Sequence, residues 1–125
     1  MAHNFEIEYV TSTSSVLEKD GIVVHVVNDD AAAADVQVVI YQNTGAGAAV
    51  VADSGVTSVV ATWQWGMAYP VPSSGEYWVR VRAASAFLVP KVSFERLENS
   101  VWRPVDTYRP GDFAVFRVGA RTRLW

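Results

Sequence analysis

Apolar and polar residues alternate along most of this chain with the period of two that is typical of half-buried β-strands. In residues 5–9, three apolar side chains fall on one face and two glutamates on the other. Residues 76–83 alternate in the same way, with Tyr and Val opposite Trp and Arg. Helical periodicity is nearly absent, so the pattern predicts an all-β fold.

Turn-forming residues divide the chain into short segments of this kind. The segments that we expect to be strands are residues 5–9, 22–27, 36–42, 48–52, 56–65, 76–83, 87–98, 101–105 and 113–118. Their connections are too short for the crossovers that parallel strands need. The spacing is typical of an antiparallel sandwich or barrel. We expect a single antiparallel β-sandwich of about eight strands over residues 1–118, followed by a basic tail at 119–125.

Prolines restrict two of these segments. Residues 66–75 contain Pro70, Pro72 and two serines, which predicts a long exposed loop. Pro90 interrupts the apolar run 87–98. Because proline has no backbone N–H to donate to a ladder, we expect Pro90 at an edge position or a bulge.

The formal charge changes sign near the middle of the chain. Residues 1–62 hold eight Asp or Glu and one Lys, a charge of −7, whereas residues 63–125 hold five acids and nine Lys or Arg, a charge of +4. The two values sum to the net charge of −3. Arg rather than Lys favours bidentate pairing with carboxylates. The split therefore predicts a homo-oligomer whose copies meet through complementary charged faces.

The basic end of the chain is where we first expect contact with another chain. Arg117, Arg121, Arg123 and Trp125 have no obvious partner close to them in the sequence. Basic residues interleaved with aromatics are also the pattern of single-strand nucleic-acid binders. The net negative charge and the scarcity of Lys argue against nucleic acid and in favour of a protein partner.

Aromatic and basic side chains also alternate on two expected strands. Trp63 and Trp65 share one face of theirs, while Trp78, Arg80 and Arg82 share one face of the other. If the two strands are antiparallel neighbours, one register sets Trp65 opposite Trp78 and Trp63 opposite Arg80, forming a cation–π ladder. The alternative is a row of exposed Trp that binds sugar rings, as in a carbohydrate-binding module. If the strands lie in opposite sheets, neither arrangement forms.

Catalytic, metal and cofactor sites find little support. The chain has two histidines, of which His3 lies at the terminus and His25 is expected on a sheet surface. The Gly-Ala-Gly of residues 45–47 lacks the further glycine and the helix of a phosphate loop. The acidic cluster of residues 28–35 matches no calcium loop and is ordinary turn chemistry. We expect no enzyme, no metal and no cofactor.

The absence of cysteine allows a reducing compartment, and we expect the protein in the cytoplasm. No secretory signal is visible at the start, although a signal peptide removed during cloning would leave the same start. No apolar run is long enough for a membrane span, so we expect no membrane insertion.

Two stretches carry a family resemblance. The first is the strand that ends in Asn-Asp-Asp at 28–30, its Ala-containing connection and the second strand that ends in Ile-Tyr at 40–41. The second is Val-Pro-Lys-Val at 89–92, followed by Phe-Glu-Arg-Leu at 94–97. Together they resemble the small soluble transducer of microbial sensory rhodopsin. The chain lacks that family's Trp-rich opening, and residues 102–118 have no counterpart. The resemblance implies a homo-oligomeric β-sandwich that acts as an adaptor.

Overall fold

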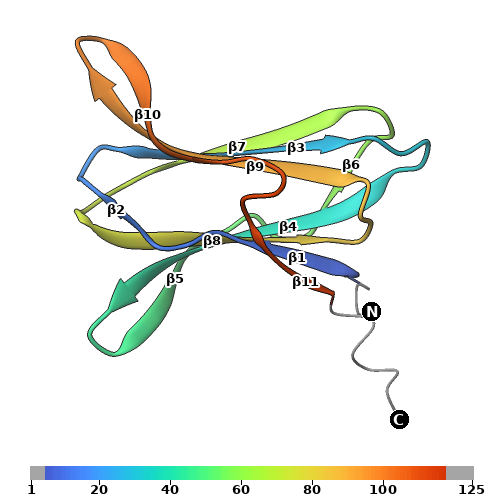
Figure 1. Cartoon of the computed structure of the whole chain (residues 1–125), viewed down its shortest axis with the longest axis horizontal. Helices are drawn as coiled ribbons and strands as arrows, with labels where there is room; N and C mark the ends of the chain where they lie inside the picture. Colours follow the sequence, from blue (N-terminus) through green and yellow to red (C-terminus); the bar gives the residue numbers. More distant parts are fainter. Residues whose placement is uncertain (1–4, 118–125) are drawn as a thin grey trace.

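The computed structural model describes residues 5–117 as two antiparallel β-sheets that pack face to face (Figure 1). The seven strands of sheet A are β1 (Ile7–Val10), β2 (Ser14–Val16), β4 (Ala34–Thr44), β5 (Gly47–Asp53), β6 (Thr57–Val59), β8 (Gly75–Ala83) and β11 (Ala114–Arg117). The four strands of sheet B are β3 (Gly21–Asn28), β7 (Gln64–Pro70), β9 (Leu88–Glu98) and β10 (Val101–Tyr108). The all-β sandwich predicted from the sequence is confirmed.

Each sheet has a simple order of neighbours. Sheet A runs β11-β1-β8-β4-β5, with β2 also paired to β8 and β6 also paired to β4. Sheet B runs β10-β9-β3-β7. Every strand pair within these residues is antiparallel. The long strands β8 and β4 form the centre of sheet A, and β9 and β3 form the centre of sheet B.

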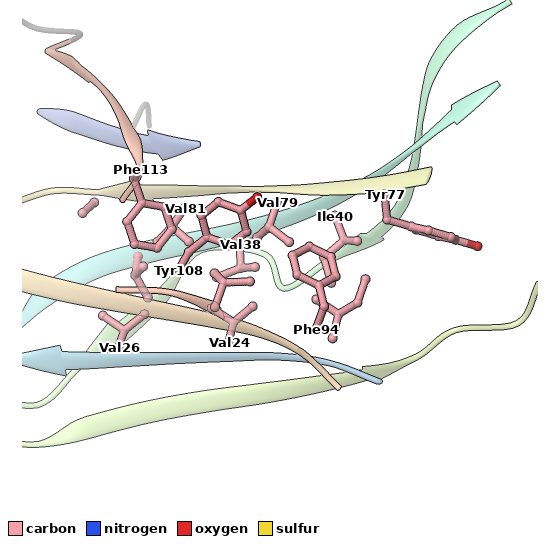
Figure 2. Packing of buried hydrophobic residues seen from close by; sticks show 14 of the residues in the cluster. Val24, Val26, Val38, Ile40, Tyr77, Val79, Val81, Phe94, Tyr108 and Phe113 are labelled. Atoms are coloured by element: carbon pink, nitrogen blue, oxygen red, sulfur yellow. The ribbon is translucent and has the colours of Figure 1, made fainter. Parts of the chain in front are cut away.

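Alternation along these central strands creates the core. In β3, Ile22, Val24 and Val26 are fully buried, whereas the residues between them face outward and are partly exposed. The inward residues of β4 and β8 meet them across the sandwich (Figure 2). At roughly 25 cal/mol per Å² of buried apolar surface, this layer of Val, Ile and aromatic side chains is the main favourable contribution to folding. A one-residue slip of register would move the whole set into water.

The segment predicted as one long strand at 56–65 is two strands in different sheets, which is one reason why the described residues form eleven strands rather than about eight. Residues 60–63 turn the chain, with Thr62 in the left-handed region at a φ of 57°. Before the turn, β6 pairs with β4 of sheet A, and after it β7 pairs with β3 of sheet B. The β-branched run gave no sign of this break because Thr and Val suit strands on either side of it.

The loop predicted at 66–75 is also wrong over its first half. Residues 66–70 belong to β7, and Val71 is buried behind them. Pro70 is tolerated because it is the last residue of an edge strand.

The prediction that Pro90 lies at an edge is confirmed for one side of this residue, although β9 is a central strand of sheet B. Pro90 pairs with Val26 of β3, but β10 reaches no further along β9 than Val92, so the other side of Pro90 is a local edge.

Two hairpins extend from the same end of the sandwich and diverge from each other (Figure 1). One joins β4 to β5 in sheet A, and the other joins β9 to β10 in sheet B. We call the second hairpin, residues 95–104, the β9–β10 arm. Its turn residues Asn99 and Ser100 have φ values of 51° and 65°. Two consecutive positive φ values are the signature of a type I′ turn, whose twist matches that of the flanking strands.

Candidate functional site

The structure separates the three Trp residues that were expected to form one ladder or platform. Trp65 lies on β7 of sheet B and packs partly against the core. Trp78 lies on β8 of sheet A, on the face directed away from sheet B. Trp63 lies in the turn before β7 and is 63% exposed. The predicted pairings of Trp65 with Trp78 and of Trp63 with Arg80 are therefore wrong, because the segment that joins β7 to β8 crosses from one sheet to the other.

Trp78 finds a different aromatic partner on the outer face of sheet A. Its ring stacks on Tyr41 of β4, which lies directly opposite in the ladder, with ring centroids 4.0 Å apart and planes inclined by 10°. The indole N–H donates a hydrogen bond of 3.0 Å to Oδ1 of Asn43. Arg80 Cζ lies 5.2 Å from the Tyr41 ring centroid and 5.8 Å from that of Trp78. Tyr41 thus covers one face of Trp78, and neither Trp63 nor Trp65 lies beside it to form a platform.

Arg80 and Arg82 share one carboxylate, that of Glu8 on β1. The Arg82 Nε atom donates to Glu8 Oε2 at 3.1 Å, and Arg80 Nε lies 3.8 Å from Oε1. Arg82 Cζ also lies 4.8 Å from the ring centroid of Phe5. Within residues 5–117, Arg80 Nε is buried and makes no hydrogen bond. The expected cation–π pattern therefore exists, but with Tyr41 and Phe5 in addition to Trp78.

A polar row crosses four strands of this outer face. It starts at Glu8 and Arg82, continues through a 3.3 Å hydrogen bond from Arg82 Nη1 to Gln37 Oε1, and ends at Asp53. Gln37 Nε2 donates to Asp53 Oδ1 at 3.0 Å. This hydrogen bond, with a second one from the Gly55 amide, holds the pKa of Asp53 below its ordinary value. The row joins residues that are far apart in the sequence.

Another ion pair ties the two halves of the chain together. Asp20, 2% exposed, accepts hydrogen bonds from Arg96 and from the Leu17 amide. Burial by itself raises the pKa of Asp20, but these hydrogen bonds outweigh burial and lower it. Several arginines of the basic half are therefore neutralised by carboxylates of the acidic half in the same chain. At these positions, the acidic and basic halves of the sequence do not form two separate faces of opposite charge.

The residues expected to contact a partner lie at the end of the chain. Arg117 is the last residue of β11 and pairs with Ile7 of β1 at the edge of sheet A. Arg121, Arg123 and Trp125 lie outside the described residues. Their role as a contact for another chain stays a prediction.

Sequence reasoning missed a hollow that lies on the outer face of sheet B. It is a groove of about 350 Å³ beside the β9–β10 arm, and we call it the Trp102 groove. Its lining residues are Lys19, Asp20, Gly21, Val23, Ala68, Tyr69, Pro70, Glu95 and Trp102. Trp102 is 50% exposed. The sequence offers one sign of this groove, an aromatic residue two positions after the Asn-Ser turn. Only the order of the strands shows that this residue, Trp102, lies over Gly21.

The two edge strands of sheet B, β10 and β7, differ in how they are protected. Charges, prolines and bulges discourage an edge strand from pairing with another chain. On the edge strand β10, Arg103, Pro104 and a register shift after Pro104 serve this purpose. The strand β7 has a proline only at its last residue, Pro70, has no charged residue, and pairs with β3 without a register shift. Within residues 5–117 its other edge faces no strand. We call this free side the β7 edge.

The other candidate residues have structural surroundings. His25 lies on the outer face of sheet B, paired with Gly66 on β7 and Lys91 on β9. The Asn28 amide is buried and donates to the carbonyls of Ala32 and Val59, as a turn-forming residue does. In the described part of the chain, no three His, Cys, Asp or Glu side chains gather as metal ligands. No helix among residues 5–117 is long and apolar enough to cross a membrane.

Comparison with known proteins adds information on the fold alone. No family model and no curated protein matches the chain. The structure is similar to the crystal structure of Thermotoga maritima 1070, with a TM-score of 0.61 and 8% sequence identity. The match covers 86% of this chain and 94% of that one. At this identity the likeness supports the β-sandwich fold alone.

Proposed function

We propose that the protein is a non-enzymatic assembly module that self-associates by pairing the β7 edges of two copies. The observation that carries this proposal is the β7 edge, which has no charge and no bulge and whose one proline, Pro70, is its last residue. Such an edge exposes backbone N–H and C=O groups that can pair with another strand. An assembly surface also suits an adaptor of the kind that the sequence resemblance implies. The absence of cysteine suits a role in the cytoplasm.

A second copy fits this edge because the two surfaces are identical and uncharged. Two-fold symmetry, the commonest arrangement of homo-oligomers, makes two β7 strands antiparallel. Side chains on both strands must keep their faces, so Met67 can lie opposite Met67 of the second copy. Trp65, Met67 and Tyr69, which pack partly against the core, then continue that core across the contact. Sheet B becomes a continuous sheet of eight strands, four from each copy.

Complementary charged faces, as the sequence split predicts, are the alternative mode of self-association. The two modes differ in their response to salt. Contacts between exposed charges weaken as ionic strength rises, whereas backbone pairing and apolar burial do not. The internal ion pairs of Arg82 with Glu8 and of Arg96 with Asp20 already use some of the charges that the alternative needs. This favours the β7 edge.

Analytical ultracentrifugation of the full chain at low and high salt tests the proposal. We expect a dimer at micromolar concentration in both conditions. Ala68→Lys places a charge on the outward side of β7 without entering the core, and it should raise the dissociation constant at least about tenfold. The matched control is Ala48→Lys on the exposed edge strand β5, which should leave the dimer unchanged. A monomer in both conditions overturns self-association. A dimer that dissociates in salt and tolerates Ala68→Lys overturns the β7 edge and supports charged faces.

A further inference from the structure

We infer that the Trp102 groove binds a neutral sugar ring. This inference goes beyond self-association and does not depend on it, because pairing at the β7 edge lies in the plane of sheet B and leaves the outer face open. It also differs from the platform of Trp63, Trp65 and Trp78, which the fold does not assemble. Three features carry it, namely the small residues of the groove floor, the position of the Trp102 indole and the two charges at the rim.

The floor of the groove is made of small side chains on two neighbouring strands. Gly21 and Val23 face outward from β3, and Ala68 faces outward from β7, where it pairs with Val23. The indole of Trp102 stands above Gly21, and a methyl group there would lie 3.5 Å from Cζ3 and 3.8 Å from Cη2. The groove exists because these strands carry little side-chain volume beside a large ring. Its size of about 350 Å³ lies at the lower end of the range for small-molecule sites.

The indole is placed to stack on a ligand. Trp102 lines the groove on one side and a second hollow, bounded by Leu17 and Leu97, on the other. The ring therefore lies between two hollows and is accessible from the groove. Half of this large apolar side chain is in water, which is costly for the free protein. A pyranose offers an apolar C–H face that covers the indole while its hydroxyl groups stay directed toward polar neighbours.

The rim supplies both a hydrogen-bond acceptor and a hydrogen-bond donor. Glu95 from β9 offers a carboxylate that accepts from sugar hydroxyls, and Lys19 offers an ammonium that donates to them. The backbone of Lys19 is fixed, because its N–H donates to the Val71 carbonyl at 2.9 Å and its φ is 75°. Asp20 also lines the groove but is paired with Arg96, so Lys19 and Glu95 remain as one cation and one anion that balance each other. A neutral ligand rich in hydroxyl groups therefore fits better than a phosphate or a polyanion.

The Asp20–Arg96 pair keeps this arrangement in place. It joins the base of the β9–β10 arm to the residue that precedes Gly21. Trp102 and Gly21 consequently belong to elements that are tied together beside the groove. The stacking surface is thus formed before a ligand arrives, which lowers the entropy cost of binding.

Fluorine NMR of the full chain labelled with 5-fluorotryptophan tests the inference, because each of the five Trp gives its own signal. The probes are cellobiose, maltose, lactose and N,N′-diacetylchitobiose, each titrated to saturation. We expect at least one to shift the Trp102 signal in a saturable way while the Trp63 signal stays in place. Trp102→Ala and Glu95→Gln should each raise the dissociation constant at least about tenfold, as measured by calorimetry.

Two further variants separate the groove from unspecific effects. Ala68→Leu fills the floor while keeping Trp102, and it should abolish the shift. Trp63→Ala removes an indole that is even more exposed, at another place, and should leave binding unchanged. The inference is overturned if none of the four sugars gives a saturable shift of the Trp102 signal. It is also overturned if Trp63 responds as strongly as Trp102, or if Ala68→Leu binds like the unmodified chain. Sedimentation of the same samples shows whether binding depends on the dimer.

Discussion

Arg96 donates hydrogen bonds to both carboxylate oxygens of Asp20, a residue 76 positions earlier in the chain. Its Nε atom donates to Oδ1 at 3.1 Å, and its Nη2 atom donates to Oδ2 at 3.0 Å. The same carboxylate accepts the Leu17 amide at 2.8 Å. This pair fastens the β9–β10 arm to the turn before β3, so it stabilises the fold and the wall of the Trp102 groove together.

The first prediction concerns the acid stability that this pair confers. The folded-state pKa of Asp20 is lowered, since the hydrogen bonds from Arg96 and Leu17 outweigh the effect of burial. Its contribution to stability is therefore fully present above the unfolded value of about 3.9 and is lost as the pH falls through the folded pKa. Asp20→Asn should lower the free energy of unfolding by roughly 1–3 kcal/mol at pH 7, and the deficit should shrink below about pH 4.

Urea denaturation between pH 2 and pH 7 measures this effect. Glu18→Gln, on the same turn but with an exposed side chain, is the matched control and should change the free energy of unfolding by less than about 0.5 kcal/mol. A deficit for Asp20→Asn that stays constant from pH 7 to pH 2 would show that the charge of the pair is not what stabilises the fold.

The second prediction concerns the stacked pair on the outer face of sheet A. Tyr41 and Trp78 lie directly opposite in the ladder, and Arg80 lies near both rings. Tyr41→Ala and Trp78→Ala should therefore be coupled in a double-mutant cycle by about 0.5–1.5 kcal/mol. Chemical denaturation of the two single variants and the double variant gives this value. Additive losses would mean that the stacking contributes nothing beyond the burial of each ring.

The third prediction concerns the turn of the β9–β10 arm. Ser100 has a φ of 65°, a left-handed conformation that costs a residue with a side chain roughly 1–2 kcal/mol. Ser100→Gly completes an Asn-Gly type I′ turn and should stabilise the arm by about 1 kcal/mol. Hydrogen exchange of the β9 and β10 amides should slow accordingly. Ser100→Ala, which keeps the strain but loses the hydroxyl, is the control, and equal slowing in both variants would contradict the conformational explanation.

Much of the fold was open to prediction from local patterns. The alternation in residues 76–83 correctly assigns Tyr77, Val79 and Val81 to the core and Trp78 to the outer face. Pro90 was correctly expected at an edge because a missing N–H is a local property. By contrast, the turn at residues 60–63 carries no Gly or Pro signal, since Thr62 supplies the positive φ. That turn places β6 and β7 in different sheets. Trp65 therefore lies in sheet B, away from its predicted partner Trp78 in sheet A.

The candidate sites were less accessible to sequence reasoning because they depend on which strands are neighbours. Sequence spacing places Trp78, Arg80 and Arg82 on one face, and this is correct. Their partners Tyr41 and Glu8 are set by the order β1-β8-β4. The Trp102 groove depends on the same information, since Gly21 and Ala68 are ordinary small residues until β3 and β7 lie beside the β9–β10 arm.

The sequence by itself determined the all-β class, the approximate positions of most strands and the buried face of clearly alternating segments such as residues 76–83, because these follow from the period-two geometry of a single strand. The tertiary structure alone decided how the −7 and +4 halves meet. Both sheets contain strands from the two halves, with β8 between β1 and β4 and with β3 between β9 and β7. This brings Glu8 to Arg82 and Asp20 to Arg96. The physical reason is that strand pairing is non-local. Hydrogen bonds between strands do not depend on side-chain identity, so neighbours are chosen by how the whole apolar surface is best buried.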